Sequence, residues 1–222
     1  MREPNPSVAR DVSALPIPPM PVDPRLAAAA PYQRYREMTI DEMLLENRTI
    51  FLVGEINYST ATGVIMRLLH LQNLKKDMDI SLYINSHGGS VDDTLAIYDT
   101  ICYLSCNLAT YCIGRAQSGG AIVLSAGTKG KRFILPHARV MIHQPVGGVT
   151  GQTTDVQIQA EEILKAKSQL NQILARHTGK QASQIEQDSE RDRFFSAHEA
   201  KEYGLVDKVL EPATIGDDQE KG

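Results

Sequence analysis

Ser118 has the sequence surroundings that most favour covalent chemistry. It lies in GRAQSGGA (residues 114–121), with an apolar run before it and small residues after it. A serine hydroxyl attacks a carbonyl carbon when a base accepts its proton and amide N–H groups receive the charge that develops on the oxygen. Small neighbours let a substrate backbone approach. Ser118 is therefore a candidate nucleophile, and a simple glycine turn is the alternative interpretation.

Two histidines compete for the role of general base. His143 follows the apolar residues 140–142 and precedes Gln144 and Pro145, so it ends a predicted strand just before a loop. A histidine in that place can face a cleft, although a hydrogen-bonded histidine of the core or its rim has the same sequence context. His87 lies beside two glycines and is the second candidate.

A base of this kind needs a carboxylate that fixes its tautomer and stabilises its cationic form. Asp188 and Asp192 are the downstream candidates, within DSERDRF (residues 188–194). Such a charged run is usually a solvated surface or an interface cluster. Spacing alone does not choose between the two aspartates.

A second glycine turn lies in NSHGGSV (residues 85–91), between a predicted strand and a predicted helix. Backbone N–H groups at such a helix start bind anions. The chain has neither G-x-G-x-x-G nor G-x-x-x-x-G-K-[ST], which argues against nucleotide binding. An oxyanion site uses the same geometry.

Short β-rich runs alternate with helical ones over the residues that must position these groups. Apolar residues at helical spacing predict helices between the strands, with Val64, Ile65, Leu68 and Leu69 on one face. This alternation predicts an α/β fold of strand-helix units around a largely parallel sheet. The predicted strands are Thr49 to Val53, Ile80 to Ile84, Leu108 to Ile113, Arg132 to Leu135 and Val140 to His143.

The longest helical pattern runs from Thr154 to Arg176 and ends at Gly179. At 1.5 Å per residue this helix is roughly 35 Å long. That is long for the flank of a single small domain, so we expect another subunit to cover part of its apolar stripe. Packing wholly within its own domain is the alternative.

Both ends of the chain are predicted to lie outside one folded domain. Residues 1–31 hold eight of the eleven prolines, which interrupt helices and sheets. We therefore predict a flexible tail or propeptide over residues 1–34, a domain over 35–211, and a polar tail over 212–222. The length of 222 residues suits one sizeable core.

Composition restricts the partners and the compartment. The net charge of −4 gives no drive toward nucleic acid or anionic membranes. No run approaches the roughly 20 apolar residues that span a bilayer, and the N-terminus lacks the pattern of a secretory signal. Cys102, Cys106 and Cys112 lack metal-ligand spacing, and Cys102 and Cys112 fall among apolar residues where buried thiols are common. We expect a soluble cytoplasmic protein.

Three separated stretches resemble the ClpP family, the proteolytic subunits of the Clp protease. They are GRAQSGGA, GKRFILPHARVMIHQP and ERDRFFSAHEAKEYGLVD, and the likeness runs from about residue 39 to about 210. The resemblance implies a ClpP/crotonase-type fold with a long protruding handle helix. It implies Ser118 as nucleophile, His143 as general base, Asp192 as the orienting carboxylate, and the amides of Gly89 and Gly119 as an oxyanion hole.

What the family does is likewise implied by the resemblance. The family's serine endopeptidases cut unfolded polypeptides into short peptides inside two stacked heptameric rings, which can be homomeric or mixed with a paralogue. An AAA+ unfoldase of the Clp type binds the ATP, so this chain needs no cofactor or metal. The positions that match the family's unfoldase docking pocket are Tyr83, Tyr103, Tyr111, Ile113, Phe133, Leu135 and Leu210. The alternative for these residues is ordinary core.

The chain departs from the family's pattern near the catalytic groove. Gly119 replaces a usual methionine, Gln117 a usual alanine and His87 a usual proline, and the proline-rich start does not resemble the family's axial loop.

Three rival functions are considered beside the peptidase. They are a non-proteolytic ClpP-like structural subunit, a crotonase-type acyl-CoA enzyme, and a peptidase with a Ser-Lys dyad that uses Lys129 or Lys131.

Overall fold

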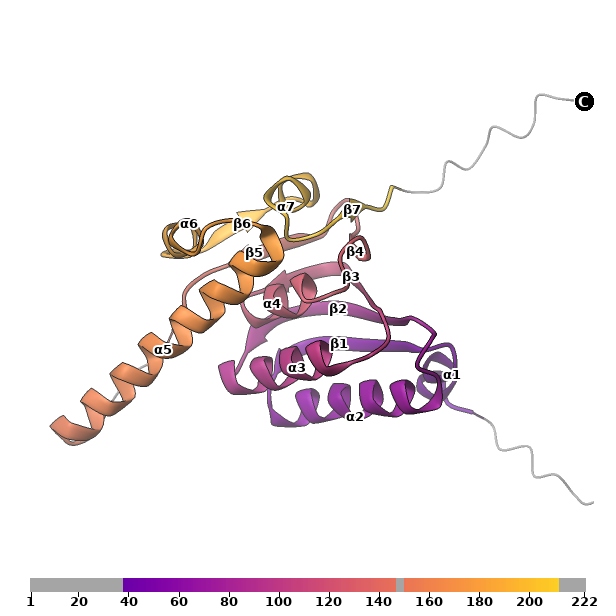
Figure 1. Cartoon of the computed structure of the whole chain (residues 1–222), viewed down its shortest axis with the longest axis horizontal. Coiled ribbons are helices and arrows are strands. Elements are labelled where there is room, and N and C mark those ends of the chain that lie inside the picture. The colour runs from indigo at the N-terminus through magenta and orange to yellow at the C-terminus, as the bar shows by residue number, and fades with distance from the viewer. Residues whose placement is uncertain (1–37, 147–149, 212–222) are drawn as a thin grey trace, which may run out of the picture. The chain divides into compact units, whose positions relative to one another are not determined.

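A computed structural model describes residues 38–146 and 150–211 of the chain (Figure 1). The two predicted tails, 1–34 and 212–222, lie outside the described residues. The elements, in chain order, are α1 (Ile40–Glu46), β1 (Thr49–Ile56), α2 (Tyr58–Leu74), β2 (Ile80–Gly89), α3 (Val91–Tyr103), β3 (Leu108–Gln117), α4 (Gly119–Ser125), β4 (Arg132–Ile134), β5 (Arg139–Ile142), α5 (Thr153–Thr178), α6 (Ala182–Asp188), β6 (Arg193–Phe195), α7 (Ala197–Tyr203) and β7 (Lys208–Val209).

The sheet is mostly parallel, as the alternation predicts, with strand order β1-β2-β3-β4-β7. Strand β3 changes partner along its length: residues 110–112 pair with β4, and residues 115–117 pair with β5. Strand β6 then pairs antiparallel with β5. The carboxyl ends of β3 and β5 therefore meet at one edge, and the start of β6 lies opposite the end of β5.

One face of the sheet forms the core under the helices. In β2, Ile80, Leu82 and Ile84 are fully buried, and they alternate with partly exposed residues. Helices α2 and α3 lie on one side of β1 and β2 in Figure 1. Val64 and Leu68 of α2 are buried there, whereas Leu69 is 40% exposed, because it lies at the margin of the apolar face.

The other face carries a row of stacked aromatic rings, here called the aromatic row. Phe51 stacks on Tyr83, Tyr83 on Tyr111 and Tyr111 on Phe133, with ring centroids 5.2, 4.6 and 4.9 Å apart. Each pair occupies matching positions on neighbouring parallel strands. The register of the sheet therefore produces the row.

Helix α5 extends beyond the sheet (Figure 1). It is two residues longer at its C-terminal end than predicted, and its buried residues, Asn171, Ile173 and Leu174, all lie in its C-terminal half. Ile158 is 55% and Leu164 64% exposed. The alternative that this helix packs wholly within its own domain is therefore wrong for its N-terminal half.

The cysteines differ in part from the prediction. Cys106 and Cys112 are buried, but Cys102 is exposed, because it lies one residue beyond the buried Ile101 and faces away from the core of α3. Across residues 38–146 and 150–211, no helix is long and apolar enough to cross a membrane.

Candidate active site

Ser118 occupies a strained turn between β3 and α4. Its backbone has φ 52° and ψ −121°, a left-handed φ that a non-glycine residue rarely adopts. The amide of Ser118 donates to Met141 O at 2.9 Å, which ties the turn to β5. Within the described ranges its hydroxyl makes no hydrogen bond, although the residue is the N-cap of α4. The turn thus presents a free hydroxyl.

The end of β2 packs directly against this turn. Gly88 has φ +91°, and a Cβ built on it would lie 2.7 Å from Ser118 Cβ and 2.8 Å from Gln117 O. Its amide is held by Ser86 Oγ at 3.1 Å. Only glycine fits this approach, so the HGG sequence fixes the wall of the site.

The sheet register brings His143 and Asp192 together. His143 follows β5 and Asp192 precedes β6, and Ile142 is paired with Arg193 in the antiparallel ladder. His143 Nδ1 lies 3.0 Å from Asp192 Oδ1. The loop after His143 is held by Gln144, whose amide donates to Ser189 O at 2.7 Å.

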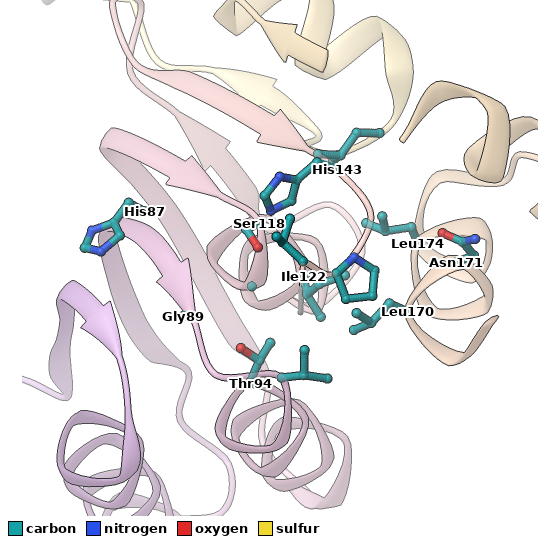
Figure 2. Close-up of a pocket in the computed structure, with 14 residues that line it drawn as sticks. His87, Gly89, Thr94, Ser118, Ile122, His143, Leu170, Asn171 and Leu174 are labelled. Carbon is teal, nitrogen blue, oxygen red and sulfur yellow. The ribbon is translucent and has the colours of Figure 1, made fainter. Parts of the chain in front are cut away.

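A cavity of about 290 Å³ opens beside Ser118 (Figure 2). Its lining combines polar residues, including Ser118, His143 and His87, with an apolar wall formed by Val91, Ile122, Pro145, Leu170 and Leu174. Figure 2 shows His143 next to Ser118 and His87 on the far side of Ser118. The cavity suits an apolar side chain of a bound molecule whose neighbouring bond is attacked by Ser118.

The two candidate histidines and the two candidate aspartates have different contacts. Among the described residues, His143 has an aspartate partner, Asp192, and His87 has none. Asp188 instead accepts from Tyr203 Oη at 2.6 Å and pairs with Arg193. Gly89 and Gly119, the predicted oxyanion donors, both line the cavity.

Among the described residues that line the cavity beside Ser118, there is no lysine for a Ser-Lys dyad. No group of three or more metal-ligating side chains gathers anywhere in the described part of the chain. Lys131 is paired with Asp79. Lys129 lines a different pocket, beside Arg132 and His177.

Comparison with known proteins settles the family. The family model described as Clp protease matches residues 32–213. The chain belongs to the Clp protease family. The ATP-dependent Clp protease proteolytic subunit 1 of Rhodopirellula baltica is 55% identical over 194 residues, which is 86% of each chain. The resemblance and the fold predicted from it are therefore confirmed. The chain is a Clp protease proteolytic subunit and hence a peptidase. The acyl-CoA and non-proteolytic alternatives are not favoured.

Gly119 departs from the Clp protease pattern for a reason visible in the packing. A Cβ on Gly119 would lie 2.3 Å from Thr94 Oγ1, and Thr94 is itself held by a hydrogen bond of 2.8 Å to Ser90 O. Thr94 therefore fills the space that a side chain at 119 would take. Neither the glycine nor the threonine signalled this pairing in the sequence.

The seven residues matched to the family's docking pocket are not ordinary core. Tyr103 is 76% and Leu135 38% exposed. The other five, Tyr83, Tyr111, Ile113, Phe133 and Leu210, are half-buried. Tyr83, Tyr111 and Phe133 belong to the aromatic row, so an apolar surface remains open on the face away from α2 and α3.

Proposed function

We propose that this chain is a serine endopeptidase in which Ser118, His143 and Asp192 act as a triad. Ser118 Oγ attacks the peptide carbonyl carbon while His143 Nε2 accepts its proton. The same proton passes to the leaving amine when the C–N bond breaks. Water, deprotonated by His143, then attacks the acyl-enzyme and releases the carboxylic acid and free Ser118.

One observation carries this proposal: the serine and the histidine follow adjacent parallel strands whose register aligns Gln117 with Met141. Asp192 meets the Nδ1 side of the imidazole, which leaves Nε2 for the hydroxyl. Figure 2 shows the imidazole beside Ser118. Catalytic hydrogen bonds commonly close only when substrate binds, so the free hydroxyl of Ser118 is compatible with this role.

The oxyanion is expected to bind the amides of Gly89 and Gly119. Gly119 is the first residue of α4, where helical N–H groups have no intrahelical acceptor. Two N–H donors aimed at the developing charge stabilise the tetrahedral intermediate more than the planar ground state.

We further propose that the chain works in the cytoplasm within two stacked heptameric rings, fed by a Clp-type AAA+ unfoldase. Family membership implies an oligomeric protease that works with Clp ATPases, and the relative's printed name includes "ATP-dependent". The exposed N-terminal half of α5 supports burial between subunits. ATP then belongs to the partner, and this chain requires no cofactor.

A fluorophosphonate probe tests the peptidase assignment. We expect the purified assembly to gain one adduct per chain at Ser118, and to degrade an unfolded protein only when ATP and a Clp unfoldase are present. Native mass spectrometry of the same sample is expected to give a fourteen-subunit complex. Labelling at another residue, or acyl-CoA turnover that survives Ser118→Ala, would show that the proposal is wrong.

The aromatic row gives a separate prediction for the unfoldase. Tyr111→Ala removes the ring between Tyr83 and Phe133 and is expected to weaken unfoldase binding about 30-fold, the size of an aromatic hot spot. Hydrolysis of a short peptide should stay within about twofold. The control is Tyr58→Ala, which removes a 79% exposed tyrosine at the start of α2. Equal losses in both assays for Tyr111→Ala would contradict a docking role.

A further inference from the structure

Asp188 is the second of the two aspartates considered for the triad, and the proposed triad does not use it. It lies at the centre of a polar cluster. Tyr203 Oη donates to its Oδ2 at 2.6 Å, and the Arg193 guanidinium forms an ion pair with its Oδ1. The Asp188 side chain is only 12% exposed. Three elements meet here, because Asp188 ends α6, Arg193 begins β6 and Tyr203 ends α7.

Two aromatic rings also contact the Arg193 guanidinium of this cluster. The Arg193 guanidinium lies 5.1 Å from the ring centroids of Phe195 and of Tyr203. Lys180 Nζ lies 4.4 Å from the Tyr203 centroid. Such cation–π contacts add to the ion pair and restrict the first residue of β6.

Asp192 needs restriction of this kind. Its side chain is 57% exposed, and within the described residues its carboxylate has His143 as its one partner. An exposed carboxylate with one hydrogen bond samples several rotamers. The position of the Asp192 carboxylate must therefore be fixed by the backbone that carries it. Arg193 is the next residue of that backbone.

We propose that Asp188, Arg193 and Tyr203 are positioning residues that hold the start of β6 so that Asp192 stays within hydrogen-bond distance of His143. This inference rests on the proposed function. Few bonds separate the cluster from the triad. Arg193 is paired with Ile142 in the β5–β6 ladder, Asp192 precedes Arg193, and His143 follows Ile142. An aspartate that spacing alone could not exclude from the triad thus serves the triad indirectly.

The charge state of Asp188 agrees with this role. Burial alone would raise the pKa of Asp188, but the hydrogen bonds from Tyr203 and Gln184 and the nearby Arg193 charge outweigh burial and lower it. The carboxylate is therefore ionised throughout the neutral range. Burial and the hydrogen bond to Asp188 raise the pKa of Tyr203, so the phenol keeps the proton that it donates.

Tyr203→Phe is the sharpest test, because it deletes one hydroxyl and keeps the ring and every formal charge. We expect kcat for a short peptide to fall about tenfold with KM within twofold, and the rate of fluorophosphonate labelling at Ser118 to fall by the same factor. Tyr98→Phe is the matched control: it removes a hydroxyl that is 3.2 Å from His177 Nε2, and it should leave both rates unchanged.

A double variant separates positioning from general destabilisation. In the Asp192→Asn background, Tyr203→Phe should lower the residual kcat by less than twofold, because the group it positions is already disabled. A further tenfold loss there, or a wild-type rate in Tyr203→Phe alone, would overturn the inference. So would losses that follow disassembly of the rings in native mass spectra.

The proposed function and this inference fail in different ways. Wild-type protein that is neither labelled at Ser118 nor hydrolyses peptide would refute the peptidase proposal. If Ser118→Ala is inactive while Tyr203→Phe behaves like wild type, only the positioning role is refuted.

Discussion

Ser118→Ala should lower kcat for peptide hydrolysis by about a million-fold, and His143→Ala should lower it by a similar factor. The alanine at 118 has no oxygen to form the acyl-enzyme, and without His143 the hydroxyl keeps its proton. What remains is the stabilisation from the oxyanion donors and from binding, which favours attack by water over the uncatalysed reaction by about 10³-fold to 10⁴-fold.

The double variant Ser118→Ala/His143→Ala should be no slower than either single variant, because the two groups act as a unit. Steady-state hydrolysis of a fluorogenic peptide, with intact mass to exclude contamination by wild type, measures all three. Ser59→Ala and His70→Ala, which change exposed residues of α2, are matched controls and should retain full activity. More than about 1% residual activity in Ser118→Ala would exclude it as the nucleophile.

The sequence predicts best those elements in which an apolar pattern marks the buried residues. Strands β2 and β3 begin at Ile80 and Leu108, as their apolar runs predict, but they continue to Gly89 and Gln117. The predicted ends at Ile84 and Ile113 are therefore wrong, because polar residues and glycines, which suggest a turn, continue both strands. Strand β6 is different: its sequence, Arg-Phe-Phe, is three residues long and mostly exposed, so no periodicity marks it. Yet β6 brings Asp192 to His143, which explains why spacing could not choose between Asp188 and Asp192.

The candidate site shows the same limit. Ser118 stands out locally because glycines and a strand end surround it. Both β2, which carries His87, and β5, which His143 follows, pair with β3 just before Ser118. The preference for His143 depends instead on the pairing of β6 with β5, which brings Asp192 to His143, and that is a tertiary fact. The aromatic row is similar, because tyrosines in a parallel strand suit either face of the sheet, and only the packing of α2 and α3 decides which face is open.

Gly88→Ala should reduce peptide hydrolysis by at least about 100-fold, the loss typical of displacing a catalytic group by about 1 Å. A methyl group at 88 would overlap Ser118 Cβ, Gln117 O and Gly119 N, which lie 2.7, 2.8 and 3.0 Å from the built Cβ. The turn must therefore shift, and both the nucleophile and the amide of Gly119 move with it. Any alanine at a φ near +90° is also strained by about 1 to 2 kcal/mol.

Gly130→Ala separates the clash from the strain. Gly130 has φ +87°, almost the same as Gly88, but no atom of the described residues lies within 4 Å of its built Cβ. Thermal unfolding should show a loss of stability from backbone strain in both variants and a larger loss in Gly88→Ala, which adds the overlaps. Only Gly88→Ala should lose fluorophosphonate labelling at Ser118. If Gly130→Ala lost activity to the same extent, strain would explain the effect. Contact between β2 and the Ser118 turn would then not be what sets the geometry of the nucleophile.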